Sequence, residues 1–149
     1  MGETLRVRPG SNVRVSIRFH VPMENTNGDA PKVDHIDLIK GLVGPKALPG
    51  TPEYQSEVNT TTAVIARFSS PDWAGQPNKG TWHTVSYVLT NVDHDCYLRL
   101  RGTNLGLDVP NETDAQGNPL IDDLVGTNDG AKAFADLWFY SNPIFIDVQ

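Results

Sequence analysis

Four histidines offer the widest range of chemistry in this sequence, because imidazole can bind a metal ion or move a proton near neutral pH. They are His20, His35, His83 and His94. None belongs to an HxH or HExxH motif, or to another spacing that preassembles a metal site. We therefore expect His20 to be solvated on a strand face, and His94, which stands between two aspartates, to occupy a hairpin turn.

His35 and Asp37 are two residues apart, so both project from the same face if the segment is a strand. Two such groups could share a ligand. The pattern favours an ordinary exposed polar face instead.

The segment "DVPNETDAQGNPLIDD", residues 108–123, is the richest in oxygen ligands, which hard cations such as calcium prefer. Its candidate ligands are Asp108, Asp114, Asp122 and Asp123. Their spacing does not match the EF-hand loop, which needs ligands at alternate positions and a glutamate at the twelfth. We expect a solvated acidic loop, with no metal and no cofactor.

No nucleophile has the local sequence that would activate it. The chain has no GxSxG elbow and no glycine-rich phosphate loop. Cys96, the single cysteine, is in phase with Leu98 and Leu100, which indicates a small buried hydrophobic side chain. No catalytic residue is predicted, and a small hydrolase with an unrecognised site is the least favoured hypothesis.

Several aromatic residues could form a platform on which sugars stack. The set comprises Trp73, Trp82, Trp138, Tyr54 and Tyr97. Such a platform, with calcium in the acidic loop, would make the chain an independent carbohydrate-binding or adhesion module. Packing in the core or at its rim is the favoured role for the tryptophans.

The totals indicate one folded domain spanning residues 1–149. A net charge of -6 argues against binding nucleic acid, and no apolar run approaches the roughly 20 residues that cross a bilayer. Arginines gather near the start of the chain, where strand alternation places them on a solvated face. These arginines are Arg6, Arg8, Arg14 and Arg18.

The elements that must position these residues are strands, because hydrophobic residues alternate with polar ones through most of the chain. The expected inward residues are Val13, Val15, Ile17, Phe19 and Val21; Ile36, Leu38 and Leu42; Val64, Ala66 and Phe68; Val85, Tyr87 and Leu89; Cys96, Leu98 and Leu100; and Ile144, Ile146 and Val148. With a short strand before Pro9-Gly10, about seven strands result. The pattern predicts an all-β antiparallel sandwich of immunoglobulin-like or related topology, with a closed barrel as the alternative.

Helix is scarce. The loop "GPKALPGTPEY" contains three prolines, which we interpret as excluding a regular element. At most one short helix is expected, from Asp129 or Gly130 to Asp136, and Gly102–Thr127 is a long loop of the kind that is functional or disordered. Leu137–Tyr140 should cover the rim of the sandwich or enter its core, and Pro143 suits the first position of a closing strand.

Three stretches, "VDHIDLIKGLV", "CYLRLRGTN" and "LWFYSNPIFI", resemble the β-sandwich domain that follows the catalytic half in PHP-type (polymerase and histidinol phosphatase) metal-dependent phosphoesterases. Many members of that group are bacterial and exported. The match spans most of the chain from about Asp34 onward. The HxH motif and the other metal ligands of the family's catalytic half have no counterpart among the four histidines, so no catalytic residue carries over.

The resemblance implies a non-catalytic C-terminal accessory domain, cut from a larger exported protein. Its partner would be the catalytic PHP domain of the same parent chain, which it would pack on and stabilise. The candidate docking residues are Tyr97, Arg99 and Arg101, since aromatic residues and arginine are enriched at interfaces. A plain solvated strand face is the favoured interpretation of the same residues.

Overall fold

The computed structural model of the chain describes residues 2–21, 23–24, 26, 28–74, 82–120 and 137–149. Its eight strands are β1 (Thr4–Val7), β2 (Ser11–His20), β3 (His35–Leu42), β4 (Ala63–Ser69), β5 (Trp82–Val92), β6 (Cys96–Thr103), β7 (Trp138–Tyr140) and β8 (Ile144–Val148). A single-turn helix, α1 (Pro52–Gln55), and a 3-10 turn at Ser70–Asp72 complete the regular structure that is described.

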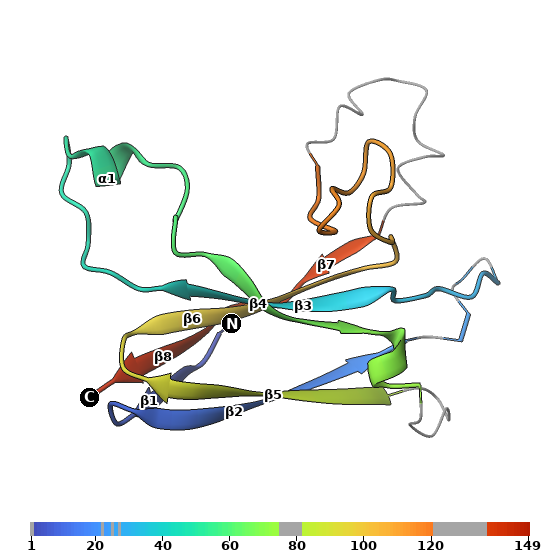
Figure 1. Cartoon of the computed structure of the whole chain (residues 1–149), viewed down its shortest axis with the longest axis horizontal. Coiled ribbons are helices and arrows are strands. Elements are labelled where there is room, and N and C mark those ends of the chain that lie inside the picture. Colours follow the sequence, from blue (N-terminus) through green and yellow to red (C-terminus); the bar gives the residue numbers. More distant parts are fainter. Residues whose placement is uncertain (1, 22, 25, 27, 75–81, 121–136) are drawn as a thin grey trace.

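The strands form two facing sheets, which confirms the predicted all-β sandwich (Figure 1). The larger sheet has the order β1-β8-β6-β3-β4, with β7 also paired to β6, and the smaller sheet is the β2-β5 pair. All pairs are antiparallel except β1 with β8, which are parallel. This order places β2 and β5 where immunoglobulin strands B and E lie, and β3, β6 and β8 where C, F and G lie.

The core lies between the sheets and follows the predicted alternation. Ile17 and Phe19 of β2 and Val85 of β5 pack with Ile36 of β3 and with Trp73. A second cluster joins the two sheets at the other end, through Val13, Leu38, Leu89, Val92, Cys96, Leu98 and Ile146. Cys96 is fully buried, as its phase predicted.

Three expected inward residues are exposed instead: Leu42, Val64 and Ile144. The cause at Val64 is a β-bulge, because Leu38 pairs with Ala66 while the next residue, Ile39, pairs with Val64. This slip turns Val64 to the outer face of the sheet. Ile144 keeps its inward phase, but the β2-β5 pair does not extend over it.

The segment between β3 and β4 was predicted to contain no regular structure. This was wrong, because the segment contains one turn of helix, α1. Thr51 caps α1, since its hydroxyl accepts a hydrogen bond from the backbone N–H of Tyr54, and Pro52 fits the first turn, where a missing N–H costs nothing. The prediction also missed β7, which pairs with β6. The helix expected from Asp129 or Gly130 to Asp136 falls outside the described residues.

Two segments project from the outer face of the larger sheet, away from β2 and β5 (Figure 1). We call residues 43–62, which carry α1, the arm, and residues 104–120, which follow β6, the cover loop. The base of the arm is closed by Leu42, whose carbonyl accepts a hydrogen bond from Asn59 and whose N–H donates to the Thr61 hydroxyl.

Candidate functional site

A row of three charged side chains crosses the outer face of the larger sheet. Asp37 of β3 is directly opposite Arg67 of β4 on one side and Arg101 of β6 on the other. Arg67 Nε and Nη2 lie 2.6 and 2.9 Å from the two Asp37 carboxylate oxygens, and Arg101 Nη2 lies 2.6 Å from Asp37 Oδ2. Paired strands therefore bring one carboxylate and two guanidinium groups into direct contact.

Asp37 has no exposed surface, and its environment acts on its pKa in two directions. Burial raises the pKa, because a charged carboxylate loses hydration, but the hydrogen bonds and charges of Arg67 and Arg101 outweigh this and lower it. Asp37 is therefore ionised near neutral pH, and both of its carboxylate oxygens accept hydrogen bonds from arginine. It is suited to a structural role rather than to transferring protons.

The same two arginines hold the cover loop on the sheet. Arg101 Nη2 donates to Asn118 Oδ1 at 2.9 Å, and Arg67 Nη1 donates to the carbonyl of Gln116. Within the loop, the buried Thr113 hydroxyl donates to the Gly106 carbonyl and accepts from the Val109 N–H. The described part of the predicted long loop is thus a packed cover over the charged row.

His35 lies on the same face as Asp37, as predicted, but both are buried, so the expectation of an exposed polar face was wrong. The hydrogen bonds from Arg67 and Arg101 to the cover loop place that loop over Asp37. His35 Nδ1 is 2.8 Å from Asp34 Oδ1, whereas its Nε2 is 4.0 Å from Asp37 Oδ2 and has no hydrogen-bond partner among the described residues. The arginines already occupy the Asp37 carboxylate, so this pair offers no open ligand site.

The predicted docking residues differ in accessibility. Arg99 is exposed, and its guanidinium carbon lies 4.7 Å from the centre of the Tyr140 ring. Tyr97 is half-buried, and its hydroxyl lies 2.6 Å from the Thr62 hydroxyl at the base of the arm. Arg101 is only 8% exposed, so its predicted place on the exposed strand face is corrected: Asp37 and Asn118 draw it beneath the cover loop.

The calcium ligands suggested by the acidic loop are not assembled in the described part of the chain. Asp114 Oδ1 accepts hydrogen bonds from the N–H groups of Gln116 and Asn118, and Oδ2 accepts one from the Asn118 amide. These hydrogen bonds lower the Asp114 pKa, and the largest contributions come from Asn118. Asp122 and Asp123 lie outside the described residues. Within the described ranges, no three His, Cys, Asp or Glu side chains form a group that could hold a metal ion.

The other three histidines lie on other parts of the sandwich and do not belong to the charged row. His20 is exposed beside Trp82, and His94 is exposed in the turn between β5 and β6, as predicted. His83 is buried, with its ring centre 5.3 Å from that of Phe19.

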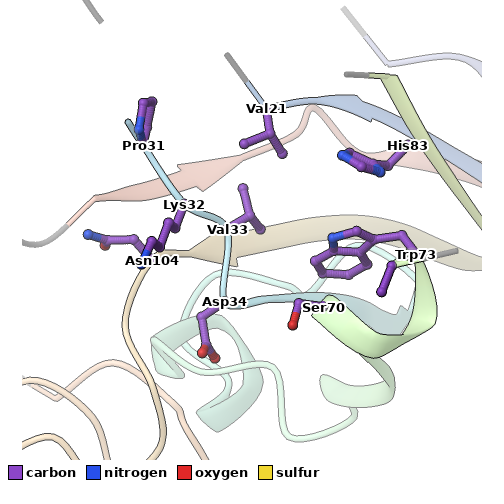
Figure 2. A pocket seen from close by; sticks show the side chains of 10 residues that line it. Val21, Pro31, Lys32, Val33, Asp34, Ser70, Trp73, His83 and Asn104 are labelled. Carbon is purple, nitrogen blue, oxygen red and sulfur yellow. The ribbon is translucent and has the colours of Figure 1, made fainter. Parts of the chain in front are cut away.

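A hollow of about 440 Å³ opens at the end of the sandwich beside His83 (Figure 2). Val21, Val33 and Trp73 give it apolar walls, and Asp34, Ser70 and Asn104 contribute polar groups. The buried Nδ1 of His83 has no hydrogen-bond partner among the described residues.

The aromatic residues do not form the platform that sugar stacking would need. Trp73 belongs to the core, whereas Trp82 is exposed on β5 under the guanidinium of Arg18, 4.4 Å from the ring centre. Trp138 lies on the larger sheet, beside Arg101. Tyr54 is on the arm.

Sequence reasoning missed the roles of Arg67 and Asn118, which bind Asp37 and Arg101 respectively. Arg67 could have been found, because it is the one charged residue in its predicted strand and lies in the outward phase, as do Asp37 and Arg101 in theirs. Asn118 gives no such signal, since it belongs to a loop without periodicity.

Comparison of the chain with protein-family models, curated proteins and solved structures finds no match. Among the described residues, no helix is long and apolar enough to cross a membrane.

Proposed function

We propose that this chain is a non-catalytic accessory domain that packs on and stabilises the catalytic half of a PHP-type metal-dependent phosphoesterase. The three stretches that resemble that group fall on β3, on β6, and on β7 with β8. These strands are neighbours in the larger sheet, so the resemblance covers one continuous block of the fold.

The observation that carries the docking role is the difference between the two outer faces of the sandwich. The outer face of β2 and β5 is polar apart from Trp82 and Val88. The larger sheet instead exposes Val64, Tyr140 and Phe145 on its outer side, around Arg99. Exposed apolar groups gathered on one side are typical of a surface that a partner covers.

The arm adds to this side of the molecule. Leu48, Tyr54 and Val58 are all strongly exposed on it, and it projects from the same face (Figure 1). A catalytic domain seated on the larger sheet would contact both the sheet and the arm. The aromatic and arginine content of the face suits such an interface.

Sequencing the gene upstream of this segment provides the first test. The proposal expects an open reading frame that continues into a region with an HxH motif. A stop codon or an unrelated domain at that place would refute it.

A binding measurement with matched variants tests the docking face. Val64 and Val88 are exposed valines in strands on opposite faces. With the catalytic half expressed separately, Val64→Glu should weaken binding at least about tenfold, because it places a charge in the interface, and Val88→Glu should leave it unchanged. Equal effects of the two substitutions would contradict docking through the larger sheet.

A further inference from the structure

One edge of β2 has no neighbouring strand in the part of the chain that the structure describes. Among the described strands, β2 pairs only with β5, in a sheet of two strands. In the immunoglobulin arrangement, strands A and D flank B and E, and β2 and β5 occupy the positions of B and E. An unpaired row of backbone N–H and C=O groups is a template on which another strand can be added.

A small apolar hollow lies along this free edge. It has a volume of about 140 Å³ and is lined by three consecutive residues of β2, Val15–Ile17, and across from them by Ser141, Asn142 and Ile144. Successive side chains of a strand point to opposite faces, so a hollow that contacts three consecutive residues lies at an edge of the strand. β5 occupies one edge of β2, and the hollow therefore lies along the free edge. Leu38, Leu98 and Leu100 form the rest of its apolar lining. The hollow can receive an apolar side chain from a strand lying on β2.

Three apolar side chains on the inner side of the larger sheet are left largely exposed, and one of them, Ile144, lines the hollow. Leu5, Phe139 and Ile144 are 46%, 41% and 46% exposed. Each points toward the inner side of the larger sheet, because their partners in the register, Ile146, Gly102 and Leu98, lie in the inward phase. A strand added to β2 would extend the smaller sheet over this uncovered area.

The charges of β2 indicate the chemistry of such a strand. Arg14 and Arg18 are exposed on the outer face, and the residues opposite them on β5 are Val88 and Thr84. Neither arginine forms an ion pair with any described residue. Pairing of two β2 edges from two copies would bring like charges together, which is unfavourable, whereas acidic side chains on an added strand would be favourable.

We propose that the free edge of β2 binds an extended segment of a partner polypeptide by β-strand addition. The segment directs apolar side chains into the hollow and places Asp or Glu beside Arg14 and Arg18. Main-chain hydrogen bonds supply affinity in this mode, and alternate side chains supply specificity. The inference does not depend on the proposed function, because it concerns the free edge of β2, whereas the proposed docking uses the outer face of the larger sheet.

Two labelled heptapeptides test the charge requirement, one alternating Val with Glu and the other alternating Val with Lys. We expect the Glu peptide to bind the wild-type chain at least about fivefold more tightly, with the preference reversed by the double substitution Arg14→Glu/Arg18→Glu. Both arginines are exposed, and a thermal melt verifies that the variant is folded. Equal affinities, or no saturable binding up to ~1 mM, would overturn the proposal.

A second measurement locates the site. Ile144→Lys places a charge at the hollow and should weaken the Glu peptide severalfold, whereas Val64→Lys, on the outer face of β4 in the larger sheet, should not. The bound peptide should also slow amide hydrogen exchange in β2. Unchanged binding by Ile144→Lys, slowed exchange confined to another strand, or a dimer of this chain paired through β2 would each refute the proposal.

Discussion

At the scale of single residues, Asp37 is the central contact on the outer face of the larger sheet. A fully buried carboxylate is tolerated only where partners replace its hydration, and Arg67 and Arg101 do so here. The two arginines then hold Gln116 and Asn118, so one buried charge also fixes the position of the cover loop.

Replacing this carboxylate should cost much more stability than replacing an exposed one. We expect Asp37→Asn to lower the free energy of unfolding by about 3–5 kcal/mol, because it leaves the two guanidinium groups without their counter-charge. Asp147→Asn is the control, since Asp147 lies 3.6 Å from an exposed Arg6, and it should cost about 0–1 kcal/mol. Urea unfolding measures both values. Similar losses in the two variants would show that the row contributes little.

The lowered pKa of Asp37 predicts the direction of a pH effect. Because the folded-state pKa is below the unfolded value, the unfolded state binds a proton first as the pH falls. The contribution of the Asp37 charge is therefore complete above a pH of about 4 and is lost as the pH falls through the folded-state pKa. The stability gap between the wild type and Asp37→Asn should narrow over that acidic range. A gap that is constant from neutral to strongly acidic pH would contradict this.

At the scale of elements, Ser141 explains how one chain segment supplies two strands beside β6. Its N–H donates to the Leu100 carbonyl at 3.0 Å, and its hydroxyl accepts from the Leu100 N–H at 2.9 Å. The side chain thus continues the hydrogen bonding between the end of β7 and the start of β8. Pro143 follows, where no N–H is needed.

Removing this hydroxyl should destabilise the junction. We expect Ser141→Ala to lower the free energy of unfolding by about 1–3 kcal/mol, because the Leu100 N–H loses its acceptor. Ser86→Ala, on the exposed face of β5, should change stability by less than about 0.5 kcal/mol. Thermal or urea unfolding of the two variants makes the comparison, and equal stabilities would argue that water replaces the hydroxyl.

The alternation of residue types predicted most inward positions, because a strand with one buried face must repeat every two residues. It was wrong at Val64, since a bulge changes the phase without leaving a trace in composition. Asp37 and Arg101 do point to the outer face, as the alternation predicted. They were expected to be exposed there, but both are buried. Local periodicity gives the face of a strand, but whether a distant loop covers that face depends on tertiary contacts.

At the scale of the whole molecule, the arm lies outside the core of the sandwich. The core clusters contain no residue of the arm, and the arm begins and ends at the hydrogen-bonded base formed by Leu42, Asn59 and Thr61. Leu48, Tyr54 and Val58 are 69%, 57% and 70% exposed, so they stabilise the isolated domain little. Their apolar surface is available to a partner.

Replacing residues 44–58 with a short Gly/Ser linker should therefore keep the sandwich folded. We expect the free energy of unfolding to change by no more than about 1 kcal/mol, because loop length affects closure entropy only slowly and the base of the arm is retained. If the proposed docking is right, the same variant should bind the separately expressed catalytic half at least about tenfold more weakly. Urea unfolding and a binding titration on one preparation separate the two effects: loss of cooperative unfolding would show that the arm supports the fold, and unaltered affinity would confine docking to the sheet.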